Sequence, residues 1–243
     1  MKPILTVLSV FFVLSFSSCT TNKSAEANTK TITESQETVE EIREIASYSS
    51  ISISSVLKVI LTDSLQGKIL LKADKDIIPF VKTEIKGNRL EIYRKKSDNY
   101  KKKDIILYVP SQGVNEILAS GVTIIETQNE ITADAFSADF SGVSKGNLNL
   151  KTNHIKLNLS GVSEVTLNGA AQTMDLIASG SSKVNAKGFI TQKTEVNVSG
   201  ACNIELFAEE SIAGTLSGAS SITANKPKIQ NIEASGVSSV NWR

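Results

Sequence analysis

The sequence predicts an all-β fold, a single-stranded parallel β-helix (solenoid) with about 19 residues per coil, and two observations indicate it. First, the Ser-Gly dipeptide occurs seven times between residues 120 and 236, with its glycines separated by 21, 19, 19, 20, 18 and 18 residues. Second, residues at even distances from each glycine are mostly apolar, and residues at odd distances are mostly polar. A fixed period near 20 indicates a stack of like units, and the alternation indicates strands with one buried face. The repeat glycines are Gly121, Gly142, Gly161, Gly180, Gly200, Gly218 and Gly236.

Each repeat is expected to hold two short strands joined at the Ser-Gly corner, with a turn such as Asn168-Gly169 on the far side. No segment between repeats has a helical period long enough for a crossover helix, so the unit closes best as one coil of a parallel β-helix. Coils stack about 4.8 Å apart, so seven coils extend about 34 Å. The glycine is expected to bend the coil or to let backbones approach closely.

Two repeat positions support this register. The residue two after each glycine is small and hydroxyl-bearing except in one repeat, which predicts a ladder inside the coil near the corner. Three after the glycine, Lys145, Glu164 and Lys183 alternate in charge, which predicts stacked ion pairs on a solvated face. The hydroxyl position holds Thr123, Ser144, Ser163, Ser182, Cys202, Ser220 and Ser238, so Cys202 is interpreted as a small buried substitute rather than a reactive thiol.

The chain divides into four segments. Residues 1–18 resemble a lipoprotein signal peptide, residues 19–41 a lipidated cysteine and disordered tether, and residues 113–243 the Ser-Gly repeat β-helix. Residues 42–112 alternate like strands but lack the Ser-Gly dipeptide, so we expect irregular opening coils or a small β-sheet that caps the stack. Trp242 is expected to cover the last coil; the alternative is an exposed platform that stacks on a sugar ring.

The N-terminus predicts a membrane anchor. Lys2 precedes a mostly apolar stretch that is too short for a lasting transmembrane helix, and small residues then lead to Cys19. This arrangement resembles a lipobox, and the resemblance implies cleavage before Cys19 and lipid on its thiol; the alternative is an ordinary secretory signal. Position 20 holds Thr rather than Asp, which favours sorting to the outer membrane by analogy with other lipoproteins. The sequence leaves open whether the protein faces the periplasm or the surface.

Composition excludes several functions. Without Lys2 the chain carries 25 basic and 25 acidic residues, which argues against nucleic acid as a partner. Once Cys19 is lipidated, Cys202 has no partner for an intramolecular disulfide. No metal or other cofactor is expected, because no Cys/His cluster has metal-ligand spacing. His154, the only histidine, is expected on a surface loop between strands rather than at a catalytic site.

The acidic residues do not predict an enzyme. Asp134, Asp139 and Asp175 fall on different coils rather than in one cluster. Glu126 and Glu205 share a repeat position but are four coils apart, about 19 Å, whereas carboxylate pairs that hydrolyse glycosides lie about 5 to 9.5 Å apart. We therefore expect no catalytic site.

One segment is a candidate for binding. A basic cluster surrounds Tyr93 and Tyr100, and it is either a solvated hairpin loop or a contact for anionic lipid headgroups or acidic glycans. The cluster consists of Arg94, Lys95, Lys96, Lys101, Lys102 and Lys103.

The repeated words, such as LNLSGVSEVTLNG at 157–169, resemble the head GIN domain family of putative auto-transporter adhesins. So do the two acids Asp74 and Asp76 before apolar residues, the run from Gly87 to Ile92, and Tyr108-Val109-Pro110. The resemblance covers about residues 45 to 240 and implies a single-stranded β-helix in a cell-envelope protein, with no catalytic residues.

These observations predict a non-enzymatic, lipid-anchored envelope protein that acts as an adhesin or binding scaffold, with an envelope glycan or protein as partner. Two alternatives remain. One is a periplasmic carbohydrate-binding or carbohydrate-processing β-helix, and the other is a module that polymerises end to end. The sequence does not determine the oligomeric state.

Overall fold

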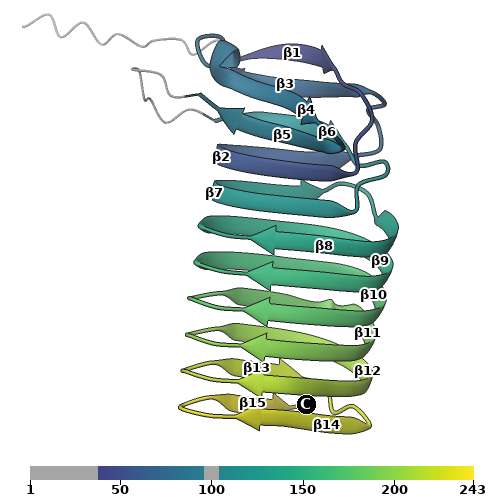
Figure 1. The fold of residues 1–243 in the computed structure, drawn as a ribbon, viewed down its shortest axis with the longest axis vertical. Helices are drawn as coiled ribbons and strands as arrows, with labels where there is room; N and C mark the ends of the chain where they lie inside the picture. The colour runs from purple at the N-terminus through teal and green to yellow at the C-terminus, as the bar shows by residue number, and fades with distance from the viewer. Residues whose placement is uncertain (1–37, 96–103) are drawn as a thin grey trace, which may run out of the picture. The chain divides into compact units, whose positions relative to one another are not determined.

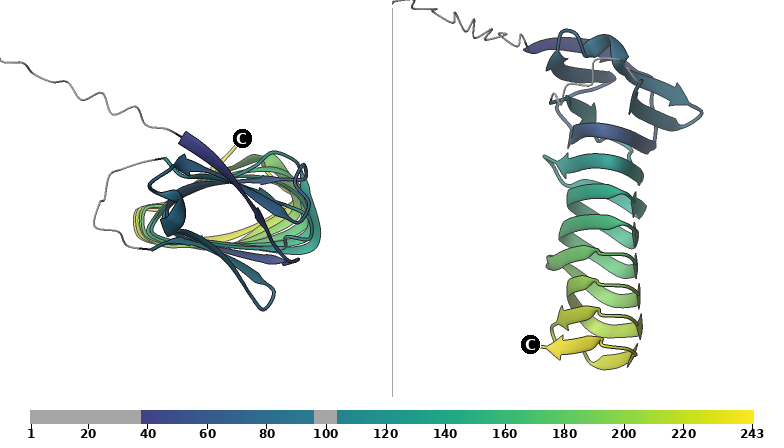
Figure 2. Two further views of the ribbon diagram at one scale, coloured as in Figure 1. Left: turned by 90° about the horizontal axis from the view of Figure 1, so that it is seen from above. Right: turned by 90° about the vertical axis from the view of Figure 1, so that its left-hand side faces the viewer.

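The computed structural model describes residues 38–95 and 104–243, which lie in one compact unit, Gln36–Arg243. It is a β-solenoid with about 19 residues per turn and about 7 turns, and 73% of it is strand. The predicted fold class is therefore confirmed. The coils stack one above the next (Figure 1), and seen along the stack they follow one flattened outline (Figure 2). In the part of the chain that the structure describes, no helix has the length and apolarity needed to cross a membrane.

Consecutive repeats pair in parallel along nearly their whole length. In the middle of the stack Val165 pairs with Gly146 on one side and with Val184 on the other. Such pairing satisfies backbone donors and acceptors of each coil with those of its neighbours. The repeat strands are β7 (Glu116–Thr127), β8 (Ile131–Phe140), β9 (Val143–Leu159), β10 (Val162–Ala178), β11 (Lys183–Val198), β12 (Asn203–Leu216), β13 (Ser221–Ala224), β14 (Ile229–Ala234) and β15 (Ser239–Trp242).

The far side of the coil differs from the prediction. We predicted a turn at Asn168-Gly169 between two short strands, but β10 continues through both residues. Asn168 pairs with Asn149, and Gly169 pairs with Leu150, so the ladder to the preceding coil is unbroken there. The predicted turn is wrong because a parallel coil has to bend without reversing direction, and a bent strand can keep its hydrogen bonds through the bend.

Six of the seven Ser-Gly corners interrupt the strands of the coil, and the exception, Ser120-Gly121, lies within β7. All seven repeat glycines have positive φ, between 71° and 87°. At Gly161 a Cβ atom would lie 2.6 Å from the carbonyl oxygen of Gly142 in the preceding coil. The same oxygen accepts a hydrogen bond of 2.8 Å from the backbone N–H of Val162, which holds the two corners together. Glycine therefore meets two requirements at this position, a left-handed backbone and a close approach between coils.

Buried side chains close five of the corners from inside, a hydroxyl in four of them and the Cys202 thiol in the fifth. The Ser163 hydroxyl, on a residue only 2% exposed, donates to the carbonyl oxygen of Ser160 at 2.8 Å, across the intervening glycine. Cys202 is equally buried, and its thiol approaches the Ser199 carbonyl oxygen at 3.2 Å in the same geometry. The inward hydroxyl thus satisfies a carbonyl that the bend turns away from the strand ladder. This contact gives a physical reason for the recurring Ser-Gly-Val-Ser word.

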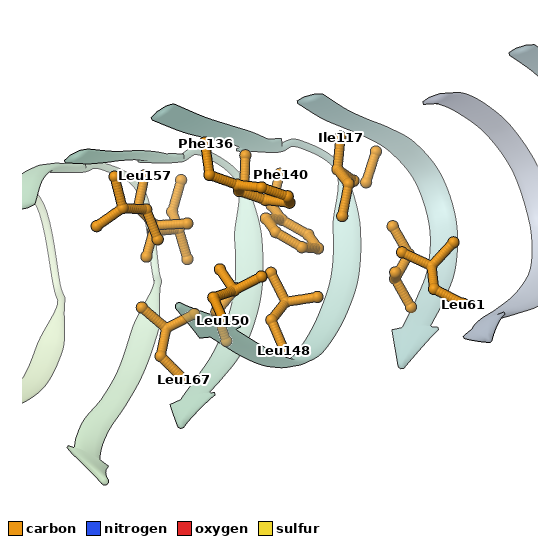
Figure 3. Close-up of a cluster of buried hydrophobic side chains, with 14 of the residues drawn as sticks. Leu61, Ile117, Phe136, Phe140, Leu148, Leu150, Leu157 and Leu167 are labelled. Atoms are coloured by element: carbon orange, nitrogen blue, oxygen red, sulfur yellow. The ribbon is translucent and has the colours of Figure 1, made fainter. Parts of the chain in front are cut away.

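Apolar side chains from alternate positions fill the interior (Figure 3). Phe136 and Phe140 are among its largest fully buried members and point into the coil beside Leu148 and Leu150. Gly146 occupies a position that holds Val or Ile in the other repeats. A Cβ there would lie 2.6 Å from Cζ of Phe140, so the glycine makes room for that ring.

The predicted charge ladder is confirmed on the wall that follows the corner. Nζ of Lys145 and Nζ of Lys183 each lie 3.5 Å from a carboxylate oxygen of Glu164. All three side chains are about half exposed, so these ion pairs favour the register without contributing much stability.

Residues 38–95 and 104–110 form the first coil and two short sheets above it. The 13-residue strand β2 (Ser50–Thr62) pairs along one side with β7. On its other side, its first half pairs with β5 (Arg89–Arg94) and its second half with β6 (Ile106–Pro110). Antiparallel strands then extend each sheet: β4 (Val81–Lys86) joins β5, and β3 (Lys68–Asp74) with β1 (Thr38–Glu44) joins β6, while a short 3-10 turn spans Ile78–Phe80.

Two polar contacts hold this end together. The Arg43 guanidinium of β1 donates to the carbonyl oxygens of Val81, at 2.8 Å, and Ile78, at 3.2 Å, and so connects the two sheets. The buried Tyr48 hydroxyl donates to the carbonyl oxygen of Pro110 at 2.6 Å.

At the other end Trp242 is partly buried against the core, in the strand that pairs with β13.

We predict that Gly161→Ala destabilises the protein more than Gly87→Ala does. Gly87 also has positive φ, but nothing lies within 4 Å of its added Cβ, so only backbone strain of about 1–2 kcal/mol is expected there. At Gly161 the clash with the preceding corner should bring the loss in unfolding free energy to about 3–4 kcal/mol. Urea unfolding of both variants measures the difference, and equal losses would contradict the packing explanation.

Because of Tyr48, we predict that the free energy of unfolding falls at alkaline pH. Burial raises the pKa of its hydroxyl well above the ordinary value. The folded state therefore favours the neutral phenol, and this stability is complete below the unfolded pKa of about 10 and is lost as the pH rises above it. Tyr48→Phe should lower the unfolding free energy by about 1–2 kcal/mol near neutral pH, because the Pro110 carbonyl oxygen loses its donor.

Urea unfolding of wild type and Tyr48→Phe at about pH 8 and about pH 11 tests this sensitivity, because the unfolded tyrosine ionises between these values. The gap between the two proteins should narrow at the higher pH. Lysines that titrate in this range do so in both proteins. A constant gap would show that Tyr48 does not titrate on unfolding.

Candidate binding groove

A polar groove of about 700 Å³ lies beside the β4–β5 hairpin. The hairpin contributes Lys86, Asn88 and Arg89 to its lining, and β9 contributes His154 and Lys156. Glu91 of β5 also lines it, and residues of β2, β7, β8 and the adjoining loops complete it: Ser49, Ser50, Asn115, Glu116, Ala135, Phe136 and Ser137. The groove therefore joins the irregular end of the chain to the first regular coils.

The groove lies where the repeat is interrupted. After Pro110 the chain makes a tight turn, in which the N–H of Val114 bonds to the carbonyl oxygen of Ser111 at 3.2 Å. The pairing of β7 with β8 begins only at Glu116 and Ser137. The first half of β8, Ile131–Phe136, thus has no paired strand on this side among residues 38–95 and 104–243.

Ion pairs fix the hairpin side of the groove. Arg89 lies 3.2 Å from the Glu116 carboxylate and donates from Nε to the Ser50 hydroxyl at 3.0 Å; Ser50 in turn contacts Glu116. Lys86 lies 2.5 Å from the Glu91 carboxylate, and this hydrogen bond raises the pKa of Lys86. These contacts hold the charged groups in place before any ligand arrives.

On the opposite side of the groove the Lys156 ammonium is available, whereas both His154 nitrogens face neighbouring side chains. Within the described part of the chain Lys156 has no acidic partner, although it is exposed and borders the groove. His154 contacts the Thr173 hydroxyl through Nδ1 at 2.8 Å, and its Nε2 lies 3.6 Å from Asp175. The groove thus combines one uncompensated cation with amide, hydroxyl and imidazole groups, which suits hydrogen bonding to a polar or anionic ligand.

The structure corrects the prediction for His154. We expected a loop between strands, but His154 lies inside β9 and pairs with Ala135 on one side and Thr173 on the other. The polar run Lys151-Thr152-Asn153-His154 was interpreted as a segment between strands. Thr152 is nevertheless buried and bonds to the carbonyl oxygens of Asp134 and His154 at 3.0 Å, so its polarity is satisfied inside the coil.

The acidic residues do not assemble. Glu126 pairs with Lys58 at 2.8 Å, and Glu205 pairs with Lys187 at 2.9 Å, a contact that lowers the pKa of Glu205. Across residues 38–95 and 104–243 there is no group of three His, Cys, Asp or Glu side chains that could hold a metal ion.

The predicted basic cluster is only partly described. Arg94 is the last residue of β5, and Lys95 follows it with its N–H bonded to the carbonyl oxygen of Phe80 at 2.9 Å. Lys96, Lys101, Lys102 and Lys103 lie outside the described residues, as do the signal segment and Cys19. The repeat glycines line the corners and not the groove.

A family model described as "Putative auto-transporter adhesin, head GIN domain" matches residues 47–227. The chain belongs to this family. The predicted resemblance is thereby confirmed, and the matched segment contains both the groove and six of the seven Ser-Gly corners. Among the curated proteins, none matches the chain.

Solved structures share the fold. A putative adhesin from Bacteroides fragilis is 22% identical, with a TM-score of 0.77 over 86% of this chain and 98% of that one. A putative adhesin from Parabacteroides distasonis is 18% identical, with a TM-score of 0.66 over the same shares. A putative lipid binding protein from Parabacteroides distasonis is 15% identical, with a TM-score of 0.65, again over 86% and 98%. At these identities the likeness concerns the fold alone.

Proposed function

We propose that the protein is a non-enzymatic, lipid-anchored protein of the cell envelope that serves as an adhesin or binding scaffold. The observation that carries this proposal is the family match to adhesins over residues 47–227. Glu126 and Glu205, which share a repeat position, each pair with a lysine on the outer wall of the stack. A rigid stack with polar outer walls is suited to presenting a surface.

The anchor is the second part of the proposal. The apolar N-terminal stretch, the small residues and Cys19 together support a lipidated mature N-terminus. From Cys19 to position 37 there are 19 residues, which reach at most about 65 Å when fully extended. That length is enough to hold the solenoid away from the outer membrane or to let it return to the membrane.

The groove favours one further candidate, binding of an acidic glycan. Lys156 supplies a positive charge without an acidic partner, and Asn88, Asn115 and Ser137 supply donors and acceptors that hydroxyl-rich ligands require. Phe136 lies under the groove but is only 2% exposed, so recognition there relies on hydrogen bonds and charge rather than on ring stacking.

Protease treatment of intact and permeabilised cells tests the location. Surface display predicts digestion of the wild type in intact cells, and a periplasmic domain predicts digestion only after permeabilisation, which would disfavour adhesion.

In both cases wild type should fractionate with membranes and Cys19→Ala should not. A Cys19→Ala variant that stays in the membrane fraction would contradict the lipid anchor.

Lys156→Gln should weaken binding of polygalacturonate, used as an acidic glycan probe, by about fivefold, equivalent to about 1 kcal/mol. The matched control is Lys193→Gln, because Lys193 lies on the same wall two coils away and outside the groove. Titration calorimetry measures both affinities, with dextran as the uncharged probe. Equal losses in the two variants, or no binding by wild type, would remove the groove as an acidic glycan site.

A further inference from the structure

The two ends of the solenoid are covered to different degrees. At the N-terminal end β1 crosses the opening of the coil, and apolar residues of the adjoining strands, such as Leu71 and Leu90, are fully buried (Figure 2). At the other end the inward side chains Ile232, Val240 and Trp242 are only partly buried. We call this surface, made by β14, β15 and these three side chains, the open end. Within the described part of the chain the core is thus covered at one end only.

Two edge strands border the open end. β14 pairs with β12 and β15 pairs with β13, and within the described residues neither has a strand on its other side. The N–H groups of Ser235 and Ser239 each bond to a carbonyl oxygen of the preceding coil at 2.9 Å. Because backbone groups alternate in direction along a strand, those of Ile232, Ala234 and Val240 point out of the open end. Such backbone groups are a template for another strand.

The edge strands at the two ends also differ in charge. At the N-terminal end, β1 carries charged side chains at four of its seven positions, and β4 carries them at three of six. β14 has one charged residue among six, Glu233, and β15 has none among four. Charged side chains on an edge strand discourage pairing with the edge of another sheet. The N-terminal edges are therefore protected against pairing, whereas the edges at the open end are suited to it.

We infer that the open end is an interaction surface for a second copy of the chain, joined about a two-fold axis. An axis perpendicular to the stack places the edges of the two copies opposite each other with their strands antiparallel, so the outward backbone groups of one copy meet those of the other. Joining of the open end to the N-terminal end, which would produce a polymer, is opposed by the charged edges and the covered core there. The contact is therefore closed at two copies.

A second copy fits this surface better than other occupants do. A single peptide strand covers the edge of β14 or that of β15 and leaves the core between them open, and a glycan or lipid has no regular row of backbone donors and acceptors. An identical end has the same outline and covers both edges and Trp242 together. The six residues of β14 extend about 20 Å and packed walls lie about 10 Å apart, so the contact is small for a specific interface. We therefore expect dissociation in the micromolar range.

The pairing itself depends neither on the proposed lipid anchor nor on the proposed location. In the pair the two N-terminal ends, which carry the groove, point apart (Figure 1). If the protein is displayed on the cell surface, as proposed above, this arrangement lets copies on two cells join through their open ends. That consequence rests on the proposed function, whereas pairing of the isolated solenoid does not.

The test uses residues 36–243, since Gln36–Arg243 forms one compact unit that contains the described core. Analytical ultracentrifugation across the micromolar range should show a monomer that converts to a dimer and to no larger species. The double variant Ile229→Lys, Ala234→Lys brings like charges of the two copies together and should weaken dimerisation at least tenfold. The matched control Ile177→Lys, Ala201→Lys makes the same changes at exposed positions of inner coils and should dimerise as the unmodified segment does.

Trp242, the only tryptophan of the chain, gives a second readout at the same surface. Its emission should shift to shorter wavelength as the unmodified segment dimerises, and should stay at longer wavelength in the double variant at every concentration. Thermal unfolding shows whether the double variant is folded; if it is not, Ile229→Lys alone, at a side chain that is 61% exposed, replaces it. An unmodified segment that stays monomeric, a mass that grows beyond the dimer, or a folded variant that dimerises equally well would overturn the inference.

Discussion

The close approach of one glycine corner to the next is the constraint on which the solenoid depends. Each corner adopts positive φ, and a side chain on its Cα would overlap a carbonyl oxygen of the corner before it. The hydrogen bond from Val162 to Gly142 requires this approach, and equivalent bonds continue along the stack. A side chain at one corner would therefore separate two coils at a point where their ladders are joined.

The corner also determines where polar groups can be buried. The bend leaves a carbonyl oxygen facing inward, and the hydroxyl two residues after the glycine accommodates it; Cys202 makes the corresponding thiol contact. On the opposite side of the chain the next residue, charged in Lys145, Glu164 and Lys183, faces solvent and pairs with its neighbours. The five-residue motif from the corner serine to the charged residue thus specifies both an inward hydrogen bond and an outward ion pair.

The sequence was sufficient to predict the fold class, the strand register and the rows of stacked hydroxyl and charged residues, because all three follow from a period that is repeated seven times. It was misleading at Asn168-Gly169 and around His154, where residues typical of turns and loops lie within continuous strands. In both places pairing with the adjacent coils decides the conformation, and local propensity does not. The groove could not have been predicted, since its lining comes from segments separated by up to a hundred residues, and neither Arg89 nor Lys156 stands out in the sequence.

A regular solenoid offers equivalent surfaces on successive coils, so a specific contact is expected where that equivalence fails. The groove lies where the turn after Pro110 leaves the first half of β8 paired on one side only, within the described residues. Exposed valines follow the corner glycine at Val122, Val143 and Val162, although the geometry of the corner does not require an apolar side chain there. Both departures occur in the coils nearest the irregular N-terminal strands, whereas the next three corner glycines are followed by Ser181, Ala201 and Ala219, and a valine returns only at Val237 in the last repeat. We therefore expect recognition at the N-terminal coils, while the distal coils extend the stack.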